Sequence, residues 1–157
     1  MRRDYFTLQV SDTAWVDDGG EPTKPTVTIE FEGPVSTLRE RLTGVDDEDP
    51  LDARETDVAF RLQTNVDADD ARGVVSVTNR VTGDFILELN EDADDVLRFI
   101  RAARRYGESD DGDGLYTVDI EIEGEQYVTY EKRTFLVYDQ TGELLRGESL
   151  IPSGVEL

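Results

Sequence analysis

Apolar and polar residues alternate in short stretches along most of the 157-residue chain, and this alternation limits the possible folds more than any other feature. Typical stretches are residues 6–10, 27–31, 58–62 and 118–122. Because successive side chains of a strand point to opposite faces, each stretch predicts a strand with one buried and one wet face. Such strands favour an antiparallel sheet, since parallel sheets are covered on both faces.

Turn signals connect several of these strands. Thr82-Gly83-Asp84 predicts a hairpin between residues 75–77 and 85–89, and the turn at 139–142 predicts another, with Gly142 in the left-handed conformation. A third hairpin follows residues 118–122, and its turn length sets the register of the strands.

Two registers are open for that third hairpin. A two-residue loop places Thr129 opposite Ile120. A three-residue loop with a bulge instead places Val128 and Tyr130 opposite Ile122 and Ile120, which matches apolar partners. We therefore expect the bulged turn.

Two helices are predicted. The first extends from Gly33-Pro34 to Gly44, and the second from about Glu91 to Tyr106, with Asn90 as its N-cap and Gly107 at its end. Together these elements predict an α+β fold with a mostly antiparallel sheet of about seven to nine strands and two helices packed on one face. No linker divides the chain, so we expect a single domain covering residues 1–157.

Acidic residues outnumber basic ones by 37 to 16, which gives a formal net charge of −21. Repulsion among the excess carboxylates destabilises the folded chain in dilute buffer. At about 1 M salt the Debye length is only about 3 Å, so exposed carboxylates barely repel one another. Only Lys24 and Lys132 are lysines, and arginine suits the few fixed contacts of such a surface. The composition therefore predicts a protein of a halophilic cell.

The chain contains no cysteine and no histidine, which removes the commonest acid–base and nucleophilic groups. We expect no cofactor. No stretch approaches the roughly 20 apolar residues that span a bilayer, and the N-terminal residues lack an apolar signal core, so the expected location is the cytoplasm, without membrane association.

Acidic stretches at residues 46–50, 67–70 and 108–114 are the first places to look for a metal site. The spacing around Asp110 and Asp113 does not match a calcium-binding EF-hand loop. Loose binding of hydrated cations is the favoured interpretation.

One segment, residues 98–105, departs from the acidic background because it is rich in arginine. At 100° per residue, Arg98, Arg101 and Arg105 line the helix face opposite the apolar residues. These side chains either complement the C-terminal end of the helix dipole or dock a phosphate backbone or an acidic partner. The candidate partner-binding residues are Arg98, Arg101, Arg104, Arg105, Lys132 and Arg133.

Four segments carry a resemblance to a known family: residues 3–8 (RDYFTL), 77–90 (VTNRVTGDFILELN), 131–138 (EKRTFLVY) and 149–157 (SLIPSGVEL). In these segments the chain resembles an uncharacterised family of short acidic haloarchaeal proteins, a domain of unknown function. The resemblance implies a haloarchaeal cytoplasm and brings no catalytic or binding residues.

The leading functional hypothesis is a non-catalytic binding or adaptor module. It would present a sheet face, the arginine-rich helix face or the apolar tail at 150–157 to another protein or to a homo-oligomer mate. One alternative is a nucleic-acid-associated protein that uses residues 98–105. Another is a carboxylate-dependent metal hydrolase.

Overall fold

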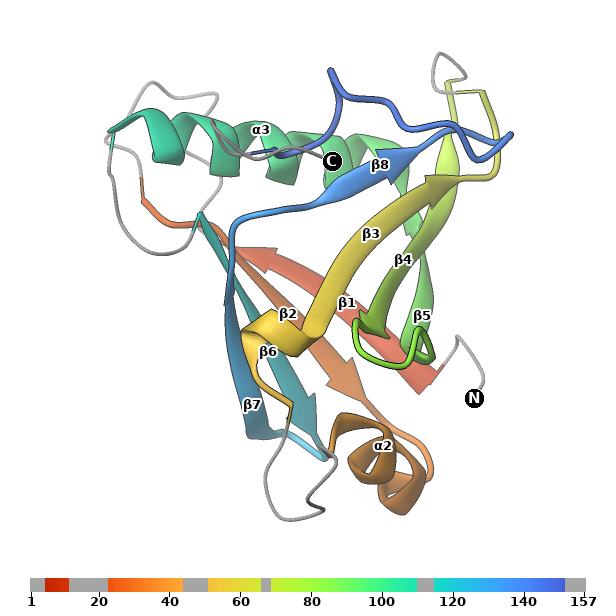
Figure 1. Ribbon diagram of the computed structural model, residues 1–157, viewed down its shortest axis with the longest axis vertical. Helices are drawn as coiled ribbons and strands as arrows, with labels where there is room; N and C mark the ends of the chain where they lie inside the picture. Colours follow the sequence, from red (N-terminus) through yellow and green to blue (C-terminus); the bar gives the residue numbers. More distant parts are fainter. Residues whose placement is uncertain (1–4, 12–22, 44–50, 66–68, 110–114, 152–157) are drawn as a thin grey trace.

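The described part of the chain comprises residues 5–11, 23–43, 51–65, 69–109 and 115–151 of a computed structural model (Figure 1). The helices are α2 (Val35–Leu42) and α3 (Ala93–Ser109), with a short 3-10 turn, η2 (Ala53–Glu55). The strands are β1 (Phe6–Ser11), β2 (Thr26–Phe31), β3 (Thr56–Leu62), β4 (Arg72–Asn79), β5 (Phe85–Asp92), β6 (Tyr116–Ile122), β7 (Glu125–Lys132) and β8 (Leu136–Tyr138).

The strands form two sheets of four. The first sheet has the order β1-β2-β6-β7 and the second has the order β5-β4-β3-β8. The pairs β2–β6 and β3–β8 are parallel, and the other pairs are antiparallel. The α+β class and the mostly antiparallel pairing are confirmed.

The predicted arrangement, one sheet with both helices on one face, is wrong. The strands divide between two sheets, and α2 and α3 lie at opposite ends of the molecule (Figure 1). Alternation identifies the buried side of each strand, but it contains no information on which strands share a sheet.

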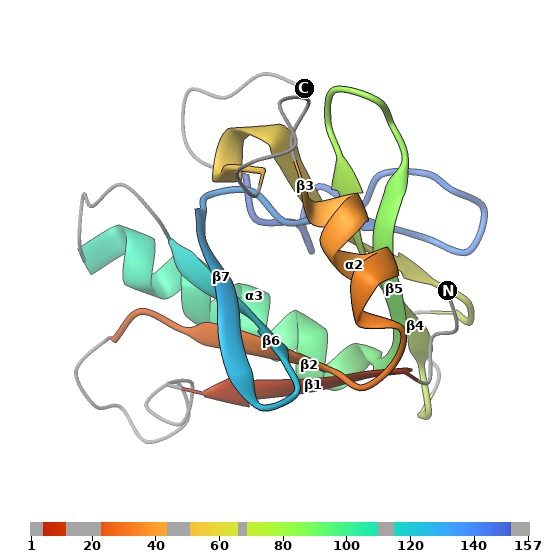
Figure 2. The same ribbon diagram turned by 90° about the horizontal axis from the view of Figure 1, so that it is seen from below.

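The inward side chains of both sheets meet in one core. Val27 and Ile29 of the first sheet, Val58 and Val75 of the second sheet, and Phe99 of α3 all line one small interior cavity. In Figure 2, α3 passes behind β2 and β6, where its apolar side enters this core. Because the inward sides of both sheets face this core, their outward sides form two separate surfaces.

The predicted apolar side of α3 is confirmed for Val96, Phe99, Ile100 and Ala103, which are buried, whereas its last residue, Tyr106, is half-buried. The ring of Phe99 lies 5.4 Å from that of Tyr116 in an edge-to-face contact. Its predicted start was wrong, since β5 continues through Asp92 and the Ala93 amide donates to the carbonyl of Ala71 at 2.9 Å. Gly107 lies inside the helix. Neither described helix has the length and apolar character needed to cross a membrane.

The turns at Gly83 and Gly142 form where they were predicted, but the second turn is followed only by the isolated bridges Tyr138–Leu144 and Phe135–Leu150 and not by a described strand. Gly83 and Gly142 have φ of 80° and 90°, as left-handed turn positions require. The third hairpin has a two-residue turn at Glu123 and Gly124, with its bulge between Ile120 and Glu121. Val128 therefore faces Ile120, and the predicted three-residue turn and register are wrong.

Candidate functional site

The outward side of the second sheet carries apolar side chains. Buried residues such as Phe60 and Val77 point to the core, so their neighbours along each strand point outward. Phe85 on this side is 53% exposed, and a groove of about 540 Å³ runs beside it between Ser76 and Tyr138. The outward apolar side chains are those of Ala59, Val74, Phe85, Leu136 and Tyr138.

Charges on this side balance. At one end, Arg72 Nη1 lies 3.2 Å from Asp92 Oδ1. At the other end, Arg80 in the turn after β4 donates from Nε and Nη2 to Asp57 Oδ1 at 3.0 and 2.5 Å, and this bonding raises the pKa of Arg80. This side carries three arginines and three acids, so we name it the neutral face. Its charged residues are Asp57, Arg61, Arg72, Arg80, Glu88 and Asp92.

The outward side of the first sheet has a different character. Its strands place threonine and carboxylate side chains outward, and Asp119 accepts hydrogen bonds from Thr129 Oγ1 at 2.6 Å and Gln126 Nε2 at 3.0 Å. Lys24, just before β2, pairs with Glu131 at 2.7 Å. We name this side the acidic face; its strand acids are Glu30, Asp119, Glu121 and Glu131.

The predicted helix arginines occupy different environments. Arg101 and Arg105 are exposed on α3, whereas Arg98 and Arg104 are half-buried. Arg104 Nη2 donates to the carbonyls of Gly147 at 3.2 Å and Ser149 at 2.8 Å, so it holds the segment after β8. Arg98 and Arg105 also have interaction partners within the protein. A partner-binding role for this group stays a prediction.

Lys132 and Arg133, the predicted extension of that group, point in different directions. Arg133 is exposed, whereas Lys132 is buried and its Nζ donates to the carbonyl of Thr56 at 2.5 Å. Burial lowers the pKa of Lys132 to about 8, while nearby Asp57 acts in the opposite direction. Lys132 therefore links β7 of the first sheet to the start of β3, and its ammonium group does not extend an exposed basic surface.

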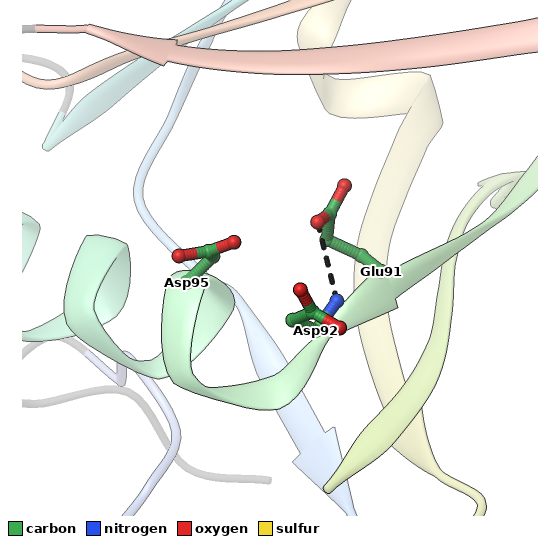
Figure 3. A group of neighbouring side chains, drawn as sticks. All are labelled: Glu91, Asp92 and Asp95. Carbon is green, nitrogen blue, oxygen red and sulfur yellow. Dashed lines mark hydrogen bonds between the residues drawn. The ribbon is translucent and has the colours of Figure 1, made fainter. Parts of the chain in front are cut away.

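Three carboxylates gather where β5 ends and α3 begins (Figure 3). Glu91, Asp92 and Asp95 each place one carboxylate oxygen within 4.8 Å of the others, and the Asp92 amide donates to Glu91 Oε1 at 3.2 Å. Burial raises the pKa of Glu91, and the negative charges of Asp95 and Asp92 raise it further. Carboxylate oxygens are hard ligands of the kind that calcium and magnesium prefer.

Neither this acidic cluster nor the neutral face was predicted from the sequence. The three acids were assigned to a helix N-terminus, and only the continuation of β5 brings Glu91 toward the first helical turn. A weak signal for the neutral face is the pair Val74-Val75, where alternation fails and β4 places an apolar side chain on each side.

Several predicted features lie outside the described residues. These are the acidic stretches at 46–50, 67–68 and 110–114, and the tail from residue 152 onward. Leu150, the first residue of the tail, is buried and exchanges backbone hydrogen bonds with Phe135 at 2.8 and 3.0 Å. The start of the apolar C-terminal segment therefore packs against its own protein.

Comparison with known proteins gives a family and no activity. No curated protein and no solved structure matches the chain. The model of a family of unknown function, DUF5793, matches residues 1–157, which is the whole sequence. The chain therefore belongs to this family of unknown function.

Proposed function

We propose that the chain is a non-catalytic binding module of a halophilic cytoplasm and that it docks another protein chain on the neutral face. The observation that carries the proposal is the contrast between the two outward sheet faces. On a molecule with a net charge of −21, one face has no excess charge and exposes Phe85 beside a groove. An exposed apolar patch rimmed by polar groups is typical of an interaction site.

The chemistry of the face supports binding over catalysis. Aromatic and arginine side chains are enriched in protein interfaces, and the neutral face offers Phe85, Tyr138 and Arg61 around small residues. The chain has no histidine or cysteine to transfer protons or form covalent intermediates. Acidic residues elsewhere would keep the molecule hydrated and soluble at high salt.

A matched pair of lysine substitutions tests the proposal. Ser76 and Thr28 are half-buried hydroxyl residues on β4 and β2, central strands of the neutral and the acidic face. The tagged protein is incubated in molar KCl with lysate of its source cells, and stoichiometric protein partners, including its own untagged copy, are quantified. Ser76→Lys should reduce retention at least about tenfold, because it places a long charged side chain at the centre of the interface.

Thr28→Lys should retain the partner as the wild type does. Unchanged retention by Ser76→Lys, or an equal loss in Thr28→Lys, would remove the neutral face as the docking surface.

A further inference from the structure

We infer that the partner docks on the neutral face through an extended acidic segment, which places a carboxylate against Arg61 and an apolar side chain against Phe85. This inference rests on the proposed binding role of that face and adds the chemistry of the partner.

Arg61 is the charge of the neutral face that is left for a partner. The two other arginines of the face are held in ion pairs with Asp92 and Asp57. Glu88, the third acid, also has an interaction partner within the protein. In the part of the chain that the structure describes, exposed Arg61 makes no hydrogen bond and no ion pair. The face therefore offers a partner one uncommitted positive charge.

Three further polar side chains gather around Arg61. Tyr138 lies directly beside it in the parallel pair of β3 and β8. Gln63 and Gln140 come just after the ends of these two strands and line the same end of the groove. Among the described residues, none of these three side chains has a hydrogen-bond partner. A carboxylate suits this end, because its two oxygens match the fork of the guanidinium and accept from the carboxamides.

The other end of the groove is apolar. Phe85 is 53% exposed at this end, and the small side chains of Ala59 and Ser76 lie side by side between it and Arg61. A groove of about 540 Å³ has room for a large apolar side chain of the partner. Packed against Phe85, such a side chain gives the docked segment its buried anchor.

The separation of the two ends sets the length of the segment. Phe85 pairs with Thr78 of β4, and Thr78 pairs with Asp57 of β3. Asp57 precedes Arg61 by four residues, so the two ends lie four residues apart along the strands and two strands apart across them. At about 3.3 Å per residue and about 4.8 Å per strand, this separation is roughly 16 Å. An extended chain covers it in about five residues.

High salt favours this complex. An acidic segment and a molecule with a net charge of −21 repel each other over a Debye length of about 10 Å at 0.1 M salt, which falls to about 3 Å at 1 M. The contact between a carboxylate and Arg61 is direct and flanked by Tyr138, so screening weakens it less. Binding of the acidic segment therefore strengthens as salt rises.

Immobilised peptides of defined sequence test the inference with the purified full chain in about 2 M KCl. Each peptide carries one phenylalanine and, three to five positions before or after it, one aspartate, asparagine or lysine, with glycine and serine elsewhere. The aspartate peptides should retain the protein at least about tenfold better than the asparagine peptides, because an amide cannot accept two charge-assisted hydrogen bonds from a guanidinium. Retention by the aspartate peptides should fall in about 0.1 M KCl.

Two matched variants assign the preference to the groove. Arg61→Gln should remove the preference for aspartate, because it removes the charge and the fork of donors. Arg54→Gln is the control, since Arg54 is exposed on η2 outside the groove, and it should keep the preference. Both variants should unfold at the wild-type temperature, because neither arginine side chain has a partner among the described residues.

Equal retention by the aspartate and asparagine peptides, a preference for the lysine peptides, or no retention by any peptide would overturn the inference. So would a preference for aspartate that survives Arg61→Gln. Potassium benzoate is the small-molecule comparison, and binding of benzoate that depends on Arg61, without binding of any peptide, would assign the groove to a small carboxylate instead. If the inference fails but Ser76→Lys still reduces capture of a partner from lysate, the proposed function stands. If Ser76→Lys captures the partner as the wild type does, both fail.

Discussion

Gly73, the second residue of β4 in the second sheet, has no room for a side chain. A Cβ atom at this position would lie 2.4 Å from the carbonyl oxygen of Arg61 and 2.6 Å from the Phe60 ring. The carbonyl belongs to the backbone of the neighbouring strand β3, so it cannot move aside without disturbing the ladder. We expect Gly73→Ala to lower the free energy of unfolding by about 1–3 kcal/mol, measured by denaturant titration in high salt.

Gly147 provides the control, because a Cβ atom there meets no atom within 4 Å and its backbone has no left-handed φ. Gly147→Ala should change the stability by less than about 0.5 kcal/mol. Equal stability of the two variants would show that β3 and β4 are not as close at Gly73 as the structure has them.

Lys132 gives the protein a specific dependence on pH. Burial lowers its pKa to about 8 in the folded chain, against 10.5 for an ordinary lysine. Between these values the unfolded chain holds a proton that the folded chain has released, so the free energy of unfolding should rise with pH. Above pH 10 two tyrosines oppose this gain, because burial raises the pKa of Tyr116 and Tyr130. The unfolded chain then loses protons that the folded chain keeps, which lowers the free energy of unfolding as pH rises.

Denaturant titrations between pH 7 and pH 10 at constant high salt should therefore show a gain of about 2 kcal/mol. Lys132→Met keeps much of the side-chain volume and removes the titrating group, so its stability should be flat over this range. A gain in Lys132→Met as large as in the wild type would assign the effect to other groups.

Among the elements, α3 is tied to the segment after β8 by one arginine. Arg104→Ala removes the hydrogen bonds to the carbonyls of Gly147 and Ser149. We expect a loss of about 1–3 kcal/mol in stability and faster hydrogen exchange at the amides of Ser149 and Leu150. Arg101→Ala, one turn earlier and exposed, should leave both measurements unchanged. Equal exchange in the two variants would mean that Arg104 does not hold this segment.

The sequence predicts the elements better than their ends. The apolar side of α3 follows from its period, and Phe99 and Ile100 are buried as expected. The start of the helix does not follow, because the ladder between β4 and β5 continues to the pair Arg72–Asp92 and keeps the acidic residues in a strand. Local capping preference favoured a helix from Glu91, and pairing with β4 outweighed it.

At the scale of the whole molecule, the pairing of distant strands could not be predicted. The parallel pairs β2–β6 and β3–β8 join segments that are far apart in the chain, and alternation is a local signal. The neutral face depends on this topology, because Arg61 and Tyr138 become neighbours only when β8 pairs with β3. Local patterns therefore predicted strand faces and missed the candidate binding surface.

The net charge of −21 should make the stability of the whole molecule depend on salt. Screening removes much of the repulsion between carboxylates, so the midpoint of thermal unfolding should rise steadily from about 0.1 M to about 2 M KCl. Scanning calorimetry at several KCl concentrations measures this. If the protein unfolded as cooperatively and at the same temperature in dilute buffer, the acidic residues would need another explanation than solubility in salt.

Site-specific photo-crosslinking tests most directly whether the neutral face is the docking surface. A photoreactive phenylalanine analogue is placed at Phe85 on the neutral face, or at exposed Gln9 on the acidic face, and the full chain is irradiated in lysate of its source cells in about 2 M KCl. We predict a crosslinked product with another chain from position 85 and none from position 9. Equal products from both positions, or a product from position 9 alone, would contradict the assignment of the neutral face.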